Sequence, residues 1–371
     1  MPAPLLSATL IVRNEERFLE GCLRSLGGRV DETVVVDTGS TDRSREIAGD
    51  LGARVIDRRW AGDFAAARNA AIDAARGAWV LYIDADERVV EFDRDAVAAE
   101  LADARCACYR VLFRPAGGLT RYREYRLFRN RAELRFSGLI HESILPALEA
   151  LRMRTGLAVG DSHVALDHLG YDGDLRAKHE RNLPLLRARL ARDPQHVYSL
   201  DHLGATLLAL GDAAGAEAAW RRAIDVVRAS GARVASDGLP WFHLATLLIE
   251  RGHDAAALLA EACAAFPENH SLAWLRARSL VAAGDYAAAA PLFAALTRVD
   301  VEALSAGSLA FDSTIFGAGA HAALGLCAFR LGRYAESAAH YARAEAIEPA
   351  NLELRSKRML SEIEARRKVA G

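Results

Sequence analysis

The amino-acid sequence predicts an α/β domain built on a parallel sheet, followed by an all-helical solenoid. Up to Asp84, four short apolar runs alternate with segments of helical periodicity, as in a parallel sheet with crossover helices. From about Arg176 onward the pattern is entirely helical and rich in alanine. At 371 residues the chain is longer than one ordinary core, so two domains are expected.

The composition narrows the classes of protein to which this chain can belong. Lysine and arginine number 47 and aspartate and glutamate 49, so the strong positive charge of a general nucleic-acid binder is absent. The five cysteines lack the spacing of a zinc site or a redox pair and suit the core of a cytosolic protein. The N-terminus does not resemble a signal peptide, and no apolar run reaches the roughly 20 residues that span a bilayer. We expect a cytoplasmic protein without a transmembrane segment or a nucleic-acid partner.

Apolar runs and turn residues place the elements of the first domain. Parallel strands are predicted at 7–12, 33–37, 53–57 and 79–83. Helices are predicted at 14–26, after a cap at Thr41 or Asp42, and at 63–77.

The segment that follows predicts a second group of elements. Alternating patterns predict short antiparallel strands at 106–113, 122–129 and 132–138. A helix is predicted to start within 138–148, with residues 141–143 in its first turn. The last strand is predicted within 161–171.

Polar side chains follow the predicted parallel strands at their C-terminal ends. Asp84 and Asp86 come after the fourth strand, Asp37 ends the second, and Asn14 follows the first. These ends lie at one edge of a parallel sheet, which is where ligands bind in such folds. Two carboxylates one residue apart can hold a divalent cation that in turn holds phosphate oxygens.

The loop after the first strand excludes two other nucleotide sites. A dinucleotide-binding site requires a glycine-rich turn there, but the sequence at 12–18 is VRNEERF, without a glycine. A phosphate-binding P-loop is also absent. A metal held by Asp84 and Asp86 is therefore the expected means of binding phosphates.

Three blocks together resemble the family 2 glycosyltransferases of the GT-A fold: LIVRNEERFLEGCLRSL, VVVDTGSTDRS and DFAAARNAAIDAARGAWVLYIDADE. The resemblance covers roughly the first 170 residues. It implies a nucleotide-sugar donor, most often a UDP-sugar, with Mn²⁺ or Mg²⁺ as cofactor and inversion at the anomeric carbon.

The resemblance also implies roles for individual residues. Asp37 matches the carboxylate that contacts the base, and Arg68 the basic residue beside it. Asp84 matches the residue near the ribose and Asp86 the direct metal ligand, while Asn14 and Glu15 line the entry to the pocket. On their residue types alone, Asn14 and Asp42 could instead cap helices, and Arg68 could form a surface salt bridge.

An inverting transfer requires a base that takes the proton from the acceptor. In the family this base lies at a helix start in an x-Glu-Asp motif, and this chain has His-Glu-Ser at 141–143. Glu142 is the candidate, although a glutamate at that place also favours a helix N-terminus without any catalytic role.

Further residues are candidates for the metal and the diphosphate. The family often completes the metal site with a histidine near the end of the fold, and His168 fits that place better than His163; His141 remains an alternative. Arg126 and Arg129, on opposite faces of a regular strand, could meet the diphosphate or form a solvated strand edge.

The second domain shows an internal repeat. Small residues at 204, 245, 277 and 325 are each followed after seven residues by glycine. Sixteen residues after each small residue come Trp220, Glu261, Phe293 and Tyr341. The pattern resembles the tetratricopeptide repeat, in which a large side chain fills the space beside a small one. Glu261 breaks it. The unit starts are separated by 41, 32 and 48 residues, which predicts insertions near 234–240 and 308–317.

Together these features predict a GT-A domain at 1–170, a helical connector at 171–196 that packs the helices onto it, and a tetratricopeptide-like domain at 197–371. The expected activity is metal-dependent transfer of a sugar to a glycan, lipid-linked or peptide acceptor, as in bacterial cell-envelope and glycocin S-glycosyltransferases. The helices are expected to bind a protein partner or a second copy of the chain. The alternative is a repeat scaffold with an inactive transferase domain.

Overall fold

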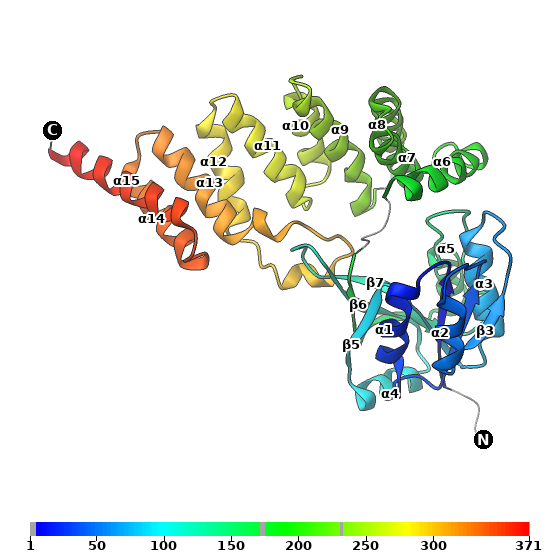
Figure 1. Cartoon of the computed structure of the whole chain (residues 1–371). Coiled ribbons are helices and arrows are strands. Elements are labelled where there is room, and N and C mark those ends of the chain that lie inside the picture. Colours follow the sequence, from blue (N-terminus) through cyan, green and yellow to red (C-terminus); the bar gives the residue numbers. More distant parts are fainter. Residues whose placement is uncertain (1–4, 171–174, 231–232, 371) are drawn as a thin grey trace. The chain divides into compact units, whose positions relative to one another are not determined.

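The computed structural model describes residues 5–170, 175–230 and 233–370, which form two compact units. The first comprises the described parts of Met1–Gly117 and Arg121–Ser199, together with Ser305–Ser308. The second comprises Gly118–Thr120 and the described parts of Leu200–Leu304 and Leu309–Gly371. Figure 1 shows strands in the blue-to-green part of the chain and helices alone beyond it. The predicted change from an α/β to an all-helical fold is confirmed.

Within the described residues, the first unit contains one eight-stranded sheet in the order β3-β2-β1-β4-β7-β6-β8-β5. Its parallel strands are β1 (Leu6–Val12), β2 (Glu32–Asp37), β3 (Arg54–Asp57) and β4 (Trp79–Tyr82). The helices between them in sequence are α1 (Glu16–Leu26), α2 (Ser44–Asp50) and α3 (Phe64–Ala74). These elements are the ones that the sequence predicts.

The other strands are β5 (Glu87–Phe92), β6 (Cys106–Pro115), β7 (Tyr122–Arg129) and β8 (Ala158–His168). β7 is antiparallel to both β4 and β6, whereas β8 is parallel to β6 and antiparallel to β5. The prediction of a strand at 132–138 is wrong. That segment is a loop, and the side-chain amide of Asn69 binds both backbone groups of Phe136, as a neighbouring strand would have done.

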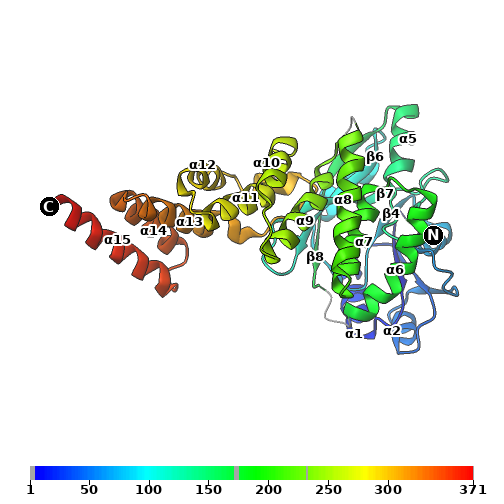
Figure 2. The same ribbon diagram turned by 90° about the horizontal axis from the view of Figure 1, so that it is seen from above.

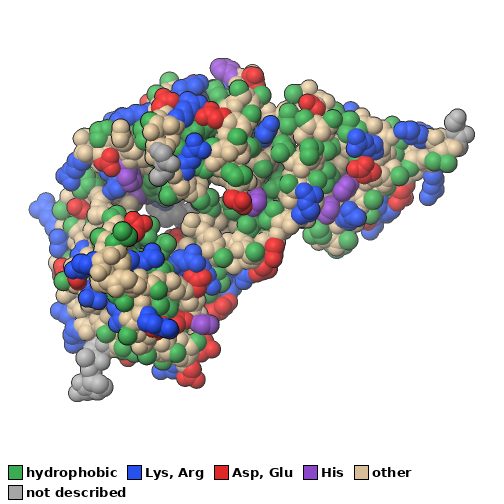
Figure 3. Space-filling model, turned by 180° about the vertical axis from the view of Figure 1, so that it is seen from behind, with side chains coloured by type: hydrophobic (Ala, Val, Ile, Leu, Met, Phe, Trp, Pro, Cys, Tyr) green, Lys and Arg blue, Asp and Glu red, His purple; other side chains and the backbone are tan. Residues whose placement is uncertain are grey.

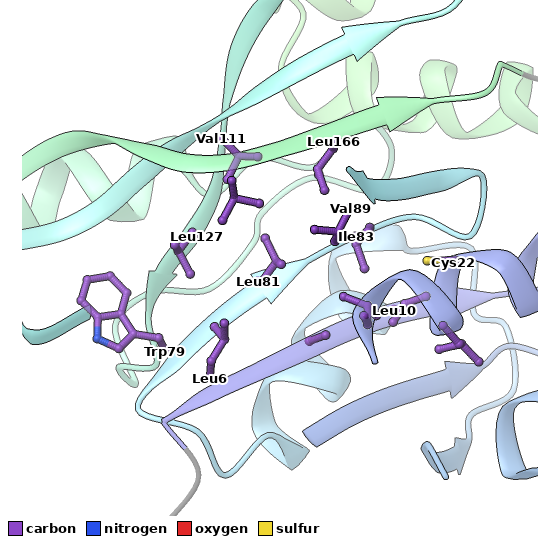
Figure 4. Close-up of a cluster of buried hydrophobic side chains, with 14 of the residues drawn as sticks. Leu6, Leu10, Cys22, Trp79, Leu81, Ile83, Val89, Val111, Leu127 and Leu166 are labelled. Atoms are coloured by element: carbon purple, nitrogen blue, oxygen red, sulfur yellow. The ribbon is translucent and has the colours of Figure 1, made fainter. Parts of the chain in front are cut away.

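Both faces of the sheet are buried, which accounts for the continuous apolar runs of its parallel strands. Trp79, Leu81 and the following Ile83 pack into a cluster with α1 and α4 (Arg94–Ala102), part of which Figure 4 shows. The alternate residues, Val80 and Tyr82, face a second cluster with α3 and α5 (Leu145–Thr155). Packing on both sides thus fixes β4 and the acidic segment that follows it.

The second unit is an array of helix pairs, which Figures 1 and 2 show as a succession along the chain. Its described helices are α7 (Val197–Ala209, from Leu200 on), α8 (Ala213–Ala229), α9 (Leu239–Glu250), α10 (Ala256–Ala265), α11 (His270–Ala282), α12 (Tyr286–Leu296), α13 (Gly317–Arg330), α14 (Tyr334–Ile347) and α15 (Leu352–Ala370). The repeated glycines follow α7, α9, α11 and α13, all with positive φ: 91° at Gly211, 74° at Gly252, 83° at Gly284 and 71° at Gly332. This left-handed conformation ends a helix at little cost only in glycine.

The small residues of the repeat allow close helix packing, as expected. A Cβ atom built on Gly204 would overlap the Trp220 indole, and one on Gly325 would lie 2.9 Å from the Tyr341 ring. Ala277 and Phe293 are fully buried in one cluster. Glu261, which breaks the pattern, instead pairs with Arg228 at 2.7 Å.

The two predicted insertions are present in the connections between helix pairs. A 3₁₀ turn, η1 (Ala235–Gly238), precedes α9. Two more, η2 (Ala303–Ala306) and η3 (Ser313–Ile315), lie between α12 and α13.

Two surface properties match the composition. No helix among the described residues combines the length and the apolar character needed to cross a bilayer. On the face that Figure 3 shows, basic and acidic side chains are interspersed, in keeping with the near balance of charge.

We predict that Gly204→Ala lowers the stability of the protein by about 1–3 kcal/mol, because the added methyl group must displace the Trp220 ring. The matched change Gly49→Ala, at a helical position with nothing within 4 Å, should leave stability unchanged or raise it by up to about 1 kcal/mol. Denaturant unfolding of both variants checks this. An unchanged midpoint for Gly204→Ala would contradict the packing described.

Candidate functional site

The C-terminal ends of the parallel strands bring the predicted polar residues to one edge of the sheet. Val12, the last residue of β1, pairs with Asp37, the last residue of β2, and Asn14 follows two residues later. Asp84 lies two residues beyond the end of β4, which pairs with β1 on its other side. Asn14, Asp37 and Asp84 therefore share this edge because of strand direction.

Asp37 is buried and has one carboxylate oxygen without a partner in the described part of the chain. The residue is only 2% exposed, and its Oδ1 accepts the amides of Gly39 and Ser40, both at 3.0 Å. Its Oδ2 is buried and has no hydrogen-bond partner among the described residues. A buried oxygen without a partner costs about 1–3 kcal/mol, so an N–H or O–H donor from a ligand would be favoured there.

Asn14 and Asp42 shape the loop that follows β2. Asn14 has a left-handed backbone, with φ 59°, and its side-chain oxygen accepts the Thr41 amide at 2.7 Å. It thus braces this loop and does not cap α1. Asp42 accepts the amides of Glu16 and Ser44, each at 3.0 Å, so it caps the first turns of α1 and α2.

Arg68 of α3 joins Asp84 to Glu142. Its Nη2 donates to Asp84 Oδ1 at 2.9 Å, and its Nε pairs with Glu142 Oε1. The guanidinium group also lies over the rings of Tyr82 and Phe136, with its carbon 4.8 and 5.7 Å from their centroids. Only 11% of its side chain is exposed, so this is a buried ion pair and not a surface salt bridge.

Arg126 of β7 also lies over the Tyr82 ring, with its guanidinium carbon 4.4 Å from the centroid. It pairs with Glu87 at 3.0 Å and Glu124 at 2.7 Å, and it approaches Asp84 at 3.6 Å. This arginine is therefore already paired with carboxylates.

Arg129 lies at the other end of the sheet. Its strand register pairs it with Trp79, the first residue of β4, and its guanidinium donates to the carbonyls of Asp103 and Cys106, both at 2.8 Å. Arg126 and Arg129 thus have different surroundings, as the alternation of a regular strand requires. The expectation that Arg129 faces a diphosphate is not met.

Asp86 and His168 come together through the pairing of β5 with β8. Glu87 pairs with His168 in register, and the Asp86 carbonyl accepts the Leu169 amide at 3.0 Å. Asp86 Oδ2 then lies 3.1 Å from His168 Nε2. His163, the other histidine of β8, pairs with Glu100 of α4 and is 65% exposed.

The Asp86–His168 pair fits a hard divalent cation. Adjacent ligands of an octahedral ion, each about 2.1 Å from it, lie about 3 Å apart, close to the observed separation. No group of three or more potential ligands lies together among the described residues. Such an ion would therefore take its remaining ligands from phosphate oxygens and water, as Mg²⁺ commonly does.

Electrostatics at this edge favour a bound cation. Burial, together with the negative charges of Asp86 and Asp84, raises the pKa of Glu15 to about 7. The hydrogen bond that His168 donates to the Asp86 carboxylate raises the pKa of His168. Burial acts to raise the pKa of Asp84, but Arg68 and Arg126 outweigh it and bring that pKa below its usual value. The two arginines thus compensate the negative charge of Asp84, whereas a bound cation would compensate the negative charge around Glu15 and Asp86.

Glu142 lies in a closed loop and not in the first turn of a helix, which corrects the sequence prediction. The backbones of Ser137 and Ser143 pair with each other at 3.0 Å in both directions, and α5 starts only at Leu145. The backbone of His141 is left-handed, with φ 50°, so the chain turns just before Glu142. The side chain of Glu142 is 10% exposed and points to Arg68.

Sequence reasoning missed Tyr82 and Glu87, which hold the two arginines in place. Burial raises the pKa of Glu87 to about 7 against the opposing charge of Arg126. Glu87 continues the acidic run after β4, so this run could have pointed to Glu87 from the sequence. The contact of Tyr82 with both arginines depends on residues distant in sequence and leaves no local pattern.

Comparisons with known proteins bear on the first unit. Residues 7–157 match the description Glycosyl transferase family 2. A TPR repeat-containing protein of Synechococcus elongatus is 36% identical over 219 residues, which cover 57% of this chain and 54% of that protein. The SPbeta prophage-derived glycosyltransferase SunS of Bacillus subtilis is 25% identical over 204 residues, covering 52% and 47%.

The chain thus spans about half the length of these two relatives. Among solved structures, glucosyl-3-phosphoglycerate synthase from Mycobacterium tuberculosis aligns with a TM-score of 0.35 and 19% identity, over 51% of this chain and 80% of that one. A likeness this weak supports no conclusion. The comparisons therefore support one statement: residues 7–157 match the glycosyltransferase family 2 domain, as the sequence resemblance implied.

Proposed function

We propose that this chain is an inverting, metal-dependent glycosyltransferase that takes its sugar from a nucleotide-sugar donor, with UDP as the nucleotide. The single observation that carries the proposal is the placement of the Asp86–His168 pair beside the Arg68-linked carboxylates Asp84 and Glu142. The acceptor belongs to the class of glycans, lipid-linked sugars or peptides. The helical unit would bind a protein partner or a second copy.

The donor nucleotide would lie along the edge from Asp37 to Asp86. The buried Oδ2 of Asp37 suits an N–H group of the base, and Asn14 shapes the loop that carries it. The side chain of Asp84 is 33% exposed, so it can reach a ribose hydroxyl while it stays paired with Arg68. Glu15 would line the entry. Arg126, held by Glu87 and Glu124, would contribute positive charge near the diphosphate without binding it directly.

Asp86 and His168 would hold the divalent metal, Mn²⁺ or Mg²⁺. When bound, the ion would neutralise the negative charge that develops on the leaving diphosphate. The protein's own contribution is to fix an oxygen and a nitrogen ligand next to each other and to leave the other positions open.

Glu142 would act as the base. Its Oε1 is engaged by Arg68, which fixes the side chain and leaves Oε2 for the acceptor hydroxyl or thiol. As the acceptor attacks the anomeric carbon from the face opposite the diphosphate, Oε2 would take its proton. The sugar is thereby transferred with inversion.

Asp86→Asn is expected to abolish Mn²⁺-dependent binding of UDP, because the amide oxygen carries no charge to offer the ion. Isothermal titration of UDP with and without Mn²⁺ measures this. Asp73→Asn, on an exposed carboxylate of α3 that pairs with Arg135, is the control and should bind as the wild type does. Equal binding by Asp86→Asn would refute the metal assignment, and no binding by the wild type would favour a scaffold without activity.

Glu142→Gln should reduce turnover by about 10²–10⁴-fold, the usual contribution of a general base, and leave UDP binding unchanged. The assay is release of UDP from a UDP-sugar in the presence of Mn²⁺, with UDP affinity measured on the same variant. If turnover stays near the wild-type value, the role of base passes to another carboxylate, and Glu124 would be tested first. A thiol acceptor would reduce the effect, since a thiolate needs less help from a base.

A further inference from the structure

The loop that carries Glu142 needs support from outside. It runs from Ser137 to Ser143, which pair through their backbones, and it contains two left-handed residues, Gly138 with φ 107° and His141 with φ 50°. A non-glycine residue in this conformation costs roughly 1–2 kcal/mol. Contacts with the rest of the first unit must therefore stabilise the loop.

One side of the loop rests on α3. The Phe64 amide donates to the Leu139 carbonyl at 3.0 Å, and Arg68 pairs with Glu142. These contacts come from within residues 7–157, the part that matches the family.

The other side rests on α6 (Leu175–Arg192), which lies beyond that match but within the first unit. The guanidinium of Arg189 covers the backbone of Gly138 so closely that a Cβ atom at Gly138 would lie 2.9 Å from Cζ. The φ of 107° favours glycine here, and any Cβ atom would also have to displace the Arg189 guanidinium. A second contact comes from the first turn of α7, where the Tyr198 ring meets His141 edge to face with 5.2 Å between centroids.

Arg189 is held in place by a histidine and not by a carboxylate. Its Nη2 lies 2.9 Å from His196 Nε2, and His196 Nδ1 lies 2.8 Å from Ser199 Oγ. Burial and the charge of Arg189 lower the pKa of His196, which favours a neutral ring that accepts the Arg189 N–H at Nε2.

Ion pairing does not account for Arg189. Its Nε is buried without a hydrogen-bond partner, and no carboxylate within salt-bridge distance of it is found among the described residues. A buried donor left without a partner is unfavourable, so an arginine here contributes little net stability of its own. Its distinctive contact is with the Glu142 loop.

We propose that Arg189 and Tyr198 are positioning residues that fix the Glu142 loop, so that residues 175–199 are part of the catalytic unit although they lie outside the family match. The inference rests on the proposed function in taking Glu142 as the base. It adds that the acceptor side of the site is completed by α6 and the start of α7.

The test uses the full chain with UDP-glucose and UDP-N-acetylglucosamine as probes, in Mn²⁺, and follows release of UDP. Arg189→Gln and Tyr198→Ala should each lower kcat by about 10- to 100-fold, because a displacement of about 1 Å at a reacting group has effects of this size. KM for the donor and the Kd of UDP should not change. Arg189→Lys, which keeps the charge but not the flat surface, should recover part of kcat.

Arg187→Gln, an exposed position on the same helix, is the matched control and should keep wild-type kcat. An unchanged kcat in both Arg189→Gln and Tyr198→Ala would overturn the proposal. A parallel loss of kcat and UDP affinity in both would also overturn it, since that result indicates general damage to the fold.

Amide hydrogen exchange separates this inference from the proposed function. In Arg189→Gln the amides of Ser137 and Ser143 should exchange faster than in Arg187→Gln, while those of α3 stay protected. If the wild-type protein releases no UDP, the proposed function fails but the exchange result still tests the loop contact. Equal exchange in the two variants would overturn the positioning role.

Discussion

The buried guanidinium of Arg68 is the interaction on which the site depends. It bridges Asp84, at the end of β4, and Glu142, in a loop 58 residues further along the chain. Without it, two carboxylates would face each other in a poorly hydrated place, and breaking such a pair costs about 3–5 kcal/mol. Tyr82 and Phe136 cover its faces, and α3 fixes its Cα. The end of β4 and the Glu142 loop are therefore joined through one side chain.

The sheet explains why these groups meet at this edge. Parallel strands bring Asp37 and Asp84 to one edge, and the return of β8 beside β5 places His168 next to Asp86. The two sides of the candidate metal pair thus come from distant parts of the sequence. Because β4 is packed on both faces, the acidic segment after it has little freedom to move. The sheet therefore presents the site in a preorganised form.

Much of this could be predicted from sequence, and the exceptions have physical reasons. Periodicity and strand ends located the parallel strands, the edge that carries Asp37 and Asp84, and the turn glycines of the helical unit. Arg126 and Arg129 could not be separated beforehand, because their partners, Glu87 and the Asp103–Cys106 turn, become known only with the register of β7.

Two other differences have the same origin in contacts between distant residues. The segment at 132–138 has the alternation of a strand but is held by Asn69 of α3. The helix predicted to include Glu142 begins three residues later, because the Ser137–Ser143 pairing closes a loop first. Anomalous diffraction at the manganese edge, from crystals grown with Mn²⁺ and UDP, would locate the bound ion. One manganese ion should be bonded to Asp86 and His168 Nε2, with Arg68 still bridging Asp84 and Glu142. A manganese ion bound away from this pair, or UDP bound away from Asp37, would contradict the proposed site.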